Sequence, residues 1–302
     1  MSAETAVSAA KPKAPPSPFA AFWYAFAENR GAVIGLVVIA LVLFCGIFAG
    51  VLTPYSPNEQ FRDVSANMAP IWAEGGSWAH PFGTDPVNRD MLARILYGSR
   101  LSIFIGLAVM LVSTLIGIII GLLCAWRGGA FDVIVLRLMN LIMAIPDLVL
   151  AMMIIAVIGP NLTNTIVAIT VVFLPRYVLL VRSSAQVELT KDYVTAAKVT
   201  GVRPLRLMLT TVLPNCLAPL IVQAALGVSD AILEAAALGF LGLGAQPPTP
   251  EWGSMLADAK DKMTSFPWVM AMPGLAILVT VLAINLMGDG LRDAFDPRLR
   301  RS

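Results

Sequence analysis

Residues 190–214 read TKDYVTAAKVTGVRPLRLMLTTVLP, a polar interruption between two apolar segments. Thr190 can cap a helix whose first turn holds Asp192, where the helix dipole favours a negative charge. Gly201 suits the left-handed position just past the end of that helix. Pro204 fits the first turn of a second helix. The stretch therefore predicts two short helices that meet at an angle near Gly201.

The first of these helices is expected to present a face of mostly small side chains. Tyr193, Ala196, Ala197 and Thr200 share that face by their three-and-four spacing. Val202 can fold back on Ala197 and close the turn. Apart from the tyrosine, these side chains are small, so another surface could come close to the backbone here.

The composition of the chain indicates an integral membrane protein. Of 302 residues, 58% are hydrophobic and 13% are charged, and the mean hydropathy is +0.79. A soluble domain needs a polar surface that this chain cannot supply. The formal net charge of +2 is too small to suggest nucleic-acid binding. We therefore expect a lipid-embedded protein with no nucleic-acid partner.

Cysteine and histidine usage argues against a metal site. Cys45, Cys124 and Cys216 lie far apart in apolar segments, where buried free thiols are more common than disulfides or metal ligands. His80 is the only histidine, which excludes a histidine-rich metal site. We expect neither a metal nor a resident cofactor in this chain.

The N-terminal region divides into a tail and a short aromatic segment. Residues 1–18 are polar and proline-containing and lack the early apolar core of a cleaved signal peptide, so they predict a disordered cytoplasmic tail. Residues 19–30 are aromatic and end in charges, which predicts a helix lying at the membrane interface. The alternative is that residues 19–30 simply extend the next helix.

A spanning helix needs about 20 apolar residues, and six segments qualify. They lie at 32–52, 101–126, 133–158, 164–182, 212–240 and 268–289. Backbone in lipid must be helical or form a closed barrel, and no strand alternation competes with the helical pattern. The fold expected is therefore an all-α polytopic membrane protein. Its parts are the tail at 1–18, an N-terminal region at 19–100, and a transmembrane domain at 101–302 that contains the polar loop at 190–214.

Six spans place both ends of the chain on one side of the membrane. If that side is cytoplasmic, the inside segments carry fourteen Lys and Arg residues and the outside segments carry six. This imbalance favours cytoplasmic termini by the positive-inside rule. The turn at Gly201 is then cytoplasmic, and residues 53–100 and 242–267 lie outside a cell inner membrane.

The sequence contains no recognisable catalytic motif. It has no P-loop, no His-Glu-x-x-His and no Gly-x-Ser-x-Gly pattern. Serine–histidine catalysis would have to use His80, which falls in a polar outer segment beside Pro81. We therefore expect that this chain is not an enzyme.

Charges inside the spans are a better signal, because they cost free energy in lipid and usually face a cavity or a partner. Asp147 follows Pro146 in the third span, and Arg176 lies in the fourth. Asp230 and Glu234 lie four residues apart in the fifth span and so share one face. They either line a translocation path and meet a cationic group, such as a peptide amino terminus, or they pair with a cation such as Arg176 or lie near the outer interface. Both interpretations remain open, while Asp147 and Arg176 fit a structural role better.

The polar stretch resembles the Glu-Ala-Ala loop of ABC importer permeases. The resemblance rests on Ala196-Ala197, then Gly201 after three residues, then Leu213-Pro214, although Thr195 stands where the family has its glutamate. In that family the loop docks in a groove of a cytoplasmic ATPase. The resemblance implies that ATPase coupling uses a set of five residues, Tyr193, Ala196, Ala197, Gly201 and Arg203.

Further stretches resemble the dipeptide/oligopeptide/nickel permeases within that family, with the greatest likeness to dipeptide permeases. The matching stretches are HPFGTDPVNRD at 80–90, LYGSR at 96–100, NCLAPLI at 215–221, ALGFLGLGAQPPTPEWG at 237–253 and NLMGDGLRDAFDPR at 285–298. Such permeases have the type I fold and work as pairs. The resemblance implies a homologous second permease, one or two ABC ATPase subunits that bind ATP and Mg²⁺, and a periplasmic peptide-binding protein.

Other functions remain as alternatives. A permease of the same family could carry oligopeptides, nickel or haem-like substrates. A passive channel would conduct without ATP. An intramembrane protease would need a nucleophile–base pair, which the sequence does not offer convincingly.

Overall fold

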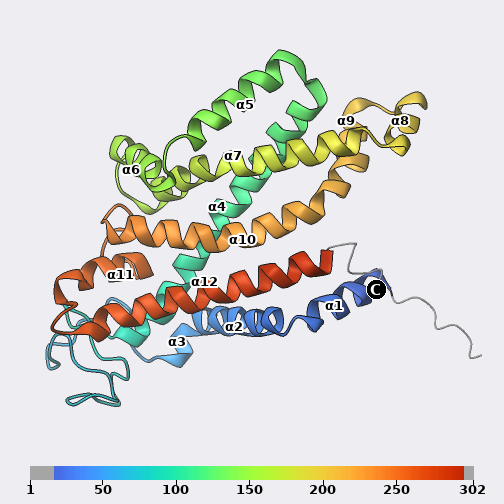
Figure 1. Cartoon of the computed structure of the whole chain (residues 1–302). Coiled ribbons are helices and arrows are strands. Elements are labelled where there is room, and N and C mark those ends of the chain that lie inside the picture. Colours follow the sequence, from blue (N-terminus) through green and yellow to red (C-terminus); the bar gives the residue numbers. More distant parts are fainter. Residues whose placement is uncertain (1–16, 296–302) are drawn as a thin grey trace, which may run out of the picture.

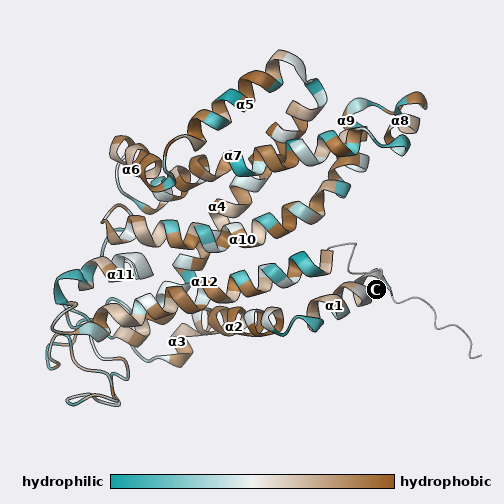
Figure 2. Ribbon diagram, in the orientation of Figure 1, coloured by the Kyte–Doolittle hydropathy of each residue, from teal (hydrophilic) through white to brown (hydrophobic). Residues whose placement is uncertain are grey.

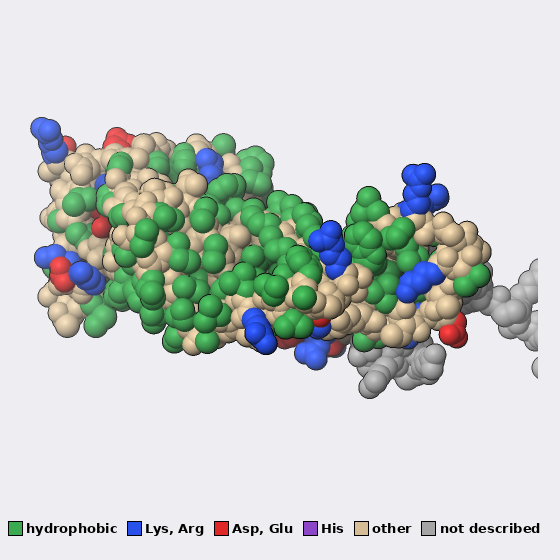
Figure 3. Space-filling model, turned by 90° about the horizontal axis from the view of Figure 1, so that it is seen from above, with side chains coloured by type: hydrophobic (Ala, Val, Ile, Leu, Met, Phe, Trp, Pro, Cys, Tyr) green, Lys and Arg blue, Asp and Glu red, His purple; other side chains and the backbone are tan. Residues whose placement is uncertain are grey.

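The computed structural model describes residues 17–295, and these form an elongated bundle of helices (Figure 1). The described residues contain isolated β-bridges but no strand that belongs to a sheet. The all-α expectation is thereby confirmed. Brown ribbon runs along the long helices in Figure 2, and hydrophobic side chains spread over much of the long face seen in Figure 3. This is the surface expected of a protein that lies in lipid.

Three helices form the N-terminal region: α1 (Pro18–Glu28), α2 (Arg30–Ile47) and α3 (Ala49–Leu52). Asn29 separates α1 from α2, because its backbone leaves the helical region and its side chain accepts a hydrogen bond from the Ala32 amide at 3.1 Å. The expected tail lies outside the described residues except for Ser17 and Pro18, which begin α1. Whether α1 lies at a membrane interface remains a prediction.

The first long helix is α4 (Met91–Arg127), which begins well before the expected start at residue 101. Asp90 caps it by accepting a hydrogen bond from the Ala93 amide at 2.6 Å. Its first turns carry polar side chains that the protein buries, including Arg94 at 1% exposure. Hydropathy placed these turns outside the span, so the expected division at residue 100 falls within one continuous helix.

The prediction of one continuous spanning helix at 133–158 is wrong. The segment forms α5 (Gly129–Met143) and α6 (Asp147–Ile158), and these two helices are bent by 94°. Pro146 lies at the break, because proline lacks an amide proton and disfavours helical backbone at the residue before it. By length and composition, the described chain has five helices that can cross a membrane, or six if this bent pair counts as one.

The remaining long helices are α7 (Leu162–Leu189), α10 (Leu213–Phe240) and α12 (Pro267–Phe295). They contain the spans expected at 164–182 and 268–289 and nearly all of the span at 212–240. In Figure 1 they run side by side, and α4 crosses behind them. The most extensive contact between two helices joins α4 to α7, where a Cβ on Gly121 would lie 2.8 Å from the Val178 carbonyl oxygen.

The shorter elements gather at the two ends of the bundle (Figure 1). One end holds α8 (Asp192–Val199) and α9 (Pro204–Leu207), together with α1 and the described C-terminus. A π-helical turn (Met208–Val212) joins α9 to α10. The opposite end holds residues 53–90 and α11 (Trp252–Ala259), which a 3-10 turn (Lys260–Lys262) follows.

Candidate functional site

The turn at Gly201 joins α8 to α9 as the sequence predicts. Gly201 has a φ of +80°, in the left-handed region. Its amide donates to the Lys198 carbonyl at 3.0 Å, and the Val202 amide donates to the Ala197 carbonyl at 3.2 Å. This pair of bonds is the Schellman arrangement that closes a helix C-terminus. The connection between the two short helices is therefore a defined turn.

The start of α8 differs from expectation. Thr190 caps the C-terminus of α7, and its hydroxyl donates to the Val187 carbonyl at 2.8 Å. Lys191 takes the position before α8 and makes no side-chain capping bond. The expectation that Thr190 caps α8 is wrong, because α7 runs on to Leu189 and the threonine bonds back to it.

Most of the expected coupling residues lie on the surface. Tyr193 is 45% exposed, Ala196, Gly201 and Arg203 are also exposed, and Ala197 is half-buried. The structure therefore brings them together on one accessible surface, formed by α8, the turn at Gly201 and α9 (residues 192–207), which we call the elbow. Their role in coupling to an ATPase remains a prediction.

Sequence reasoning missed Asn215, in the first turn of α10. Its side-chain amide donates to the Tyr193 hydroxyl at 3.2 Å and to the Thr211 carbonyl at 2.7 Å. It thus ties α8 to the base of α10, next to the π-helical turn. The stretch at 215–221 carried family resemblance but gave no sign of this contact, because it joins residues 22 positions apart.

A cluster of charges lies along the long helices. The Arg176 guanidinium on α7 contacts the Asp230 carboxylate on α10 at 3.1 Å and also contacts Asp147 at the start of α6. The Arg176, Asp147 and Asp230 side chains are 36%, 38% and 47% exposed. Groups of this kind are costly against lipid, so this face suits a water-filled cavity or a partner protein.

Glu234 lies one turn beyond Asp230 on α10, and its surroundings differ from those of Asp230. Its Oε1 atom is buried and has no hydrogen-bond partner among the described residues. The pairing alternative from the sequence therefore applies to Asp230, which contacts Arg176, and not to Glu234. Placement of either carboxylate in a translocation path remains a prediction.

The end with residues 53–90 is held by a network of buried charges. The His80 imidazole Nδ1 lies 2.9 Å from the Asp90 carboxylate, and its ring packs on Tyr55 and Phe61. Because Asp90 also caps α4, this pair fixes the outer segment to the bundle. These contacts give His80 a role in holding the outer segment in place.

Glu251 begins α11 in a buried position at 2% exposure. Its carboxylate accepts hydrogen bonds from the Gly253 and Ser254 amides, both at 2.8 Å. The Ser102 hydroxyl on α4 donates to it at 3.4 Å. Burial raises the pKa of the Glu251 carboxyl above its usual range, and these hydrogen bonds oppose the shift.

Comparison with known families agrees with this architecture. Residues 117–301 match the family described as binding-protein-dependent transport system inner membrane component. The chain belongs to this family of transport permeases. Residues 17–70 also match the N-terminal transmembrane domain of oligopeptide transport permease C. The resemblance drawn from the sequence is confirmed.

Similar proteins cover nearly the whole chain. The di/tripeptide transport system permease protein DppC of Pseudomonas aeruginosa is 52% identical over 95% of this chain and 94% of its own. The dipeptide transport system permease protein DppC of Escherichia coli K12 is 51% identical over 95% of each chain. These relatives are named as permeases and not as enzymes, and they support a multi-pass protein of the inner membrane.

A solved structure supports the fold. A chain from the structure of inward-facing conformations of the MetNI methionine ABC transporter superposes with a TM-score of 0.56 at 18% identity. The match covers 68% of this chain and 98% of the other. At this identity the likeness concerns the fold alone.

Proposed function

We propose that this chain is a permease subunit of an ATP-driven importer of dipeptides. The observation that carries the proposal is the 52% identity over 95% of the chain to a permease named for di- and tripeptides. Rival substrates within the same family are oligopeptides, nickel and haem-like molecules. An oligopeptide substrate has some support in the match of residues 17–70.

Growth on defined peptides tests the substrate. A strain that lacks its own dipeptide permease subunit, and that needs one amino acid, receives this gene together with its partner genes. Growth on a dipeptide as the only source of that amino acid is the expected result. If the strain grew only on a longer peptide, or regained only nickel uptake, that substrate and not dipeptides would be the one transported.

The chain would supply half of the translocation pathway and no motor. A homologous second permease would supply the other half, and one or two ABC ATPase subunits would bind ATP and Mg²⁺ and dock on α8 and α9. The exposed elbow at Gly201 supports this docking, since its Schellman turn holds both short helices in one arrangement. An extracytoplasmic peptide-binding protein would deliver substrate at the opposite end, beside α11.

This arrangement suggests a route for the motion. ATPase closure would push on α8, and the hydrogen bond from Asn215 to Tyr193 would pass the displacement to α10. Asp230 lies about 22 Å further along α10 at 1.5 Å per residue, where it contacts Arg176 on α7. A shift of α10 would therefore alter this contact. Alternating access could follow from such a rearrangement of packed helices.

Orientation follows from the same proposal, with both termini and the elbow in the cytoplasm. Reporter fusions after Gly201 and after Gly75 test it, because these glycines lie at opposite ends of the bundle. Cytoplasmic activity at Gly201 with periplasmic activity at Gly75 is expected. The reverse pattern would remove the elbow from any cytoplasmic ATPase and refute the coupling role.

A further inference from the structure

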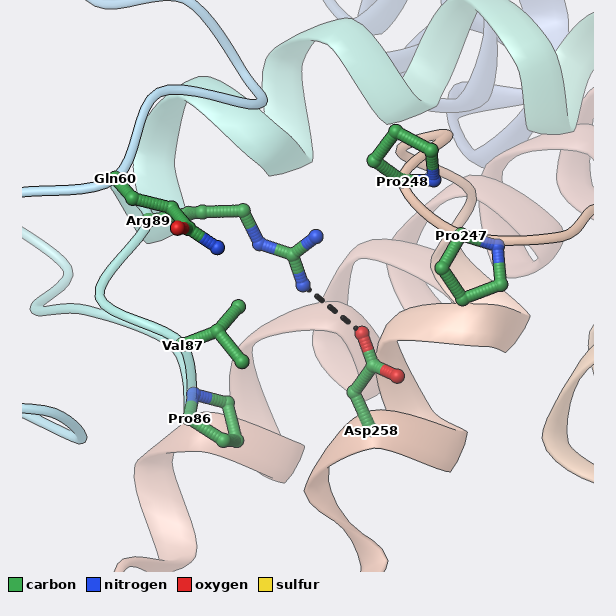
Figure 4. Close-up of a pocket in the computed structure, with 7 residues that line it drawn as sticks. All are labelled: Gln60, Pro86, Val87, Arg89, Pro247, Pro248 and Asp258. Carbon is green, nitrogen blue, oxygen red and sulfur yellow. Dashed lines mark hydrogen bonds and ion pairs between the residues drawn. The ribbon is translucent and has the colours of Figure 1, made fainter.

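A cavity opens at the end of the bundle opposite the elbow (Figure 4). Its volume is about 460 Å³, and it lies between the outer segment 53–90, the loop that follows α10, and α11. Its lining residues are Gln60, Pro86, Val87, Arg89, Pro247, Pro248 and Asp258. Three prolines and a valine form apolar walls, while a guanidinium and a carboxylate provide the charged part.

Arg89 is a buried cation whose guanidinium reaches this cavity. The residue is 5% exposed, and its Nε and one terminal nitrogen contact Asp85 at 2.5 Å and Asp258 at 3.0 Å. Figure 4 shows the other terminal nitrogen pointing toward Pro248, with no bond to the residues drawn. One donor direction of the guanidinium is thus available from the cavity.

The charges around Arg89 are balanced, so an incoming carboxylate can pair with its guanidinium by displacing Asp258. Arg94, only 1% exposed, lies 3.4 Å from Asp85 and 4.0 Å from Asp258, so two buried cations share two carboxylates. Asp85 is 4% exposed, whereas the Asp258 side chain is 33% exposed and is the member that solvent reaches. If Asp258 turned outward, two buried cations would face one anion, and a second carboxylate would restore the balance.

We propose that this cavity accepts one acidic side chain of the extracytoplasmic binding protein when it docks. This inference rests on the proposed function, which puts that protein at this end of the bundle. Val87 is 45% exposed at the cavity wall, and the apolar walls can enclose the carbon chain of a glutamate or aspartate. At protein interfaces, the residues that carry most of the binding energy often include arginine, and they lie in well-packed pockets that exclude water.

Two substitutions test the site from different directions. Val87→Trp fills the cavity without removing a charge, and Asp258→Asn removes the carboxylate that competes for Arg89. The partner permease and ATPases are co-purified with each variant in nanodiscs, which checks assembly. Affinity is then measured for the binding protein encoded with the system, loaded with a dipeptide. Ala66→Trp, at an exposed position of the same outer segment outside the lining of the cavity, is the matched control.

Val87→Trp should weaken docking by about tenfold or more, and Asp258→Asn should tighten it by about threefold, since the guanidinium becomes more available to the incoming carboxylate. Ala66→Trp should leave the affinity unchanged. Weaker docking with Asp258→Asn would mean that the cavity receives a cation, which overturns the proposal. Unchanged docking with Val87→Trp overturns it as well. Absence of docking by the unsubstituted complex would instead refute the proposed function itself.

Discussion

The Asn215 side-chain amide on α10 donates a hydrogen bond to the Tyr193 hydroxyl on α8 over 3.2 Å. The same amide group donates to the Thr211 carbonyl of the π-helical turn at 2.7 Å. One side chain therefore joins the exposed elbow, the irregular turn and the base of the helix that carries Asp230. Single π-turns within helices often mark functional positions.

Removing this link should reduce uptake more than ATP hydrolysis. Asn215→Ala and Tyr193→Phe each remove the bond between the two helices, which is worth about 1 kcal/mol, or about a fivefold effect. Dipeptide uptake per ATP hydrolysed should fall by about that factor in each variant, and the double variant should show little further loss. Uptake and hydrolysis are measured together in proteoliposomes.

Ser183→Ala is the control for this pair, because the Ser183 hydroxyl donates to the Leu180 carbonyl at 3.0 Å within α7 and makes no hydrogen bond to α8 or α10 among the described residues. Its uptake-to-hydrolysis ratio should match the unsubstituted protein. Full additivity of Asn215→Ala and Tyr193→Phe would show that the two residues act separately.

Gly201→Val should disrupt the elbow through its backbone alone. No heavy atom lies within 4 Å of a Cβ built at Gly201, so the substitution meets no neighbour. A φ of +80° costs a non-glycine residue about 1–2 kcal/mol, more if it is β-branched. Uptake should be strongly reduced, and less ATPase should co-purify with the permease.

Gly75→Val is a matched control, since Gly75 has a φ of +84° and likewise meets nothing within 4 Å. It imposes similar strain at the opposite end and should leave ATPase co-purification intact. Equal loss in both variants would assign the defect of Gly201→Val to general strain.

Asp230→Asn should lower uptake while the fold persists. Because both partners of the Arg176–Asp230 pair are more than a third exposed, the pair contributes about 1 kcal/mol or less to stability. A thermal unfolding midpoint close to that of the unsubstituted protein is therefore expected, together with reduced uptake if the carboxylate lines the path. Glu234→Gln should add to the loss.

Asp289→Asn, at an exposed position on α12, is the control for these carboxylates. Its uptake should be normal. If the Asp230→Asn, Glu234→Gln double variant transports with unchanged kinetics, neither residue belongs to the path.

Glu251 should make stability depend on pH. Burial raises the pKa of its carboxyl in the folded protein, so the folded state holds this proton at pH values where the unfolded chain, with a pKa of about 4, has released it. The folded state binds more protons in that window, and its stability therefore falls as pH rises through it. Glu251→Gln should remove this fall.

Unfolding midpoints in detergent between acid and neutral pH measure the effect. As the pH rises, the unfolding midpoint of the unsubstituted protein should fall relative to that of Glu251→Gln. Glu74→Gln, at an exposed position, should show no such change relative to the unsubstituted protein. Parallel pH curves for Glu251→Gln and the unsubstituted protein would contradict the raised pKa.

Local chemistry allowed the sequence to predict the helical membrane class and the turn at Gly201. Apolar length alone indicates a spanning segment, and glycine with a following proline marks a helix end and a new start. The same local reasoning misplaced the start of α4, because a hydropathy scale carries no information on the carboxylates among which Arg94 is buried. It also treated 133–158 as one span, although Pro146 was visible as a breaker.

The sequence by itself determined the helical membrane class and the bend at Gly201, because hydropathy and the backbone limits of glycine and proline act within a few residues. Only the tertiary structure decided which charges and amides meet. Arg176 and Asp230 are 54 residues apart, and Arg89 and Asp258 are 169 apart. Such contacts depend on how each helix is rotated and packed against its neighbours, and no local pattern encodes that.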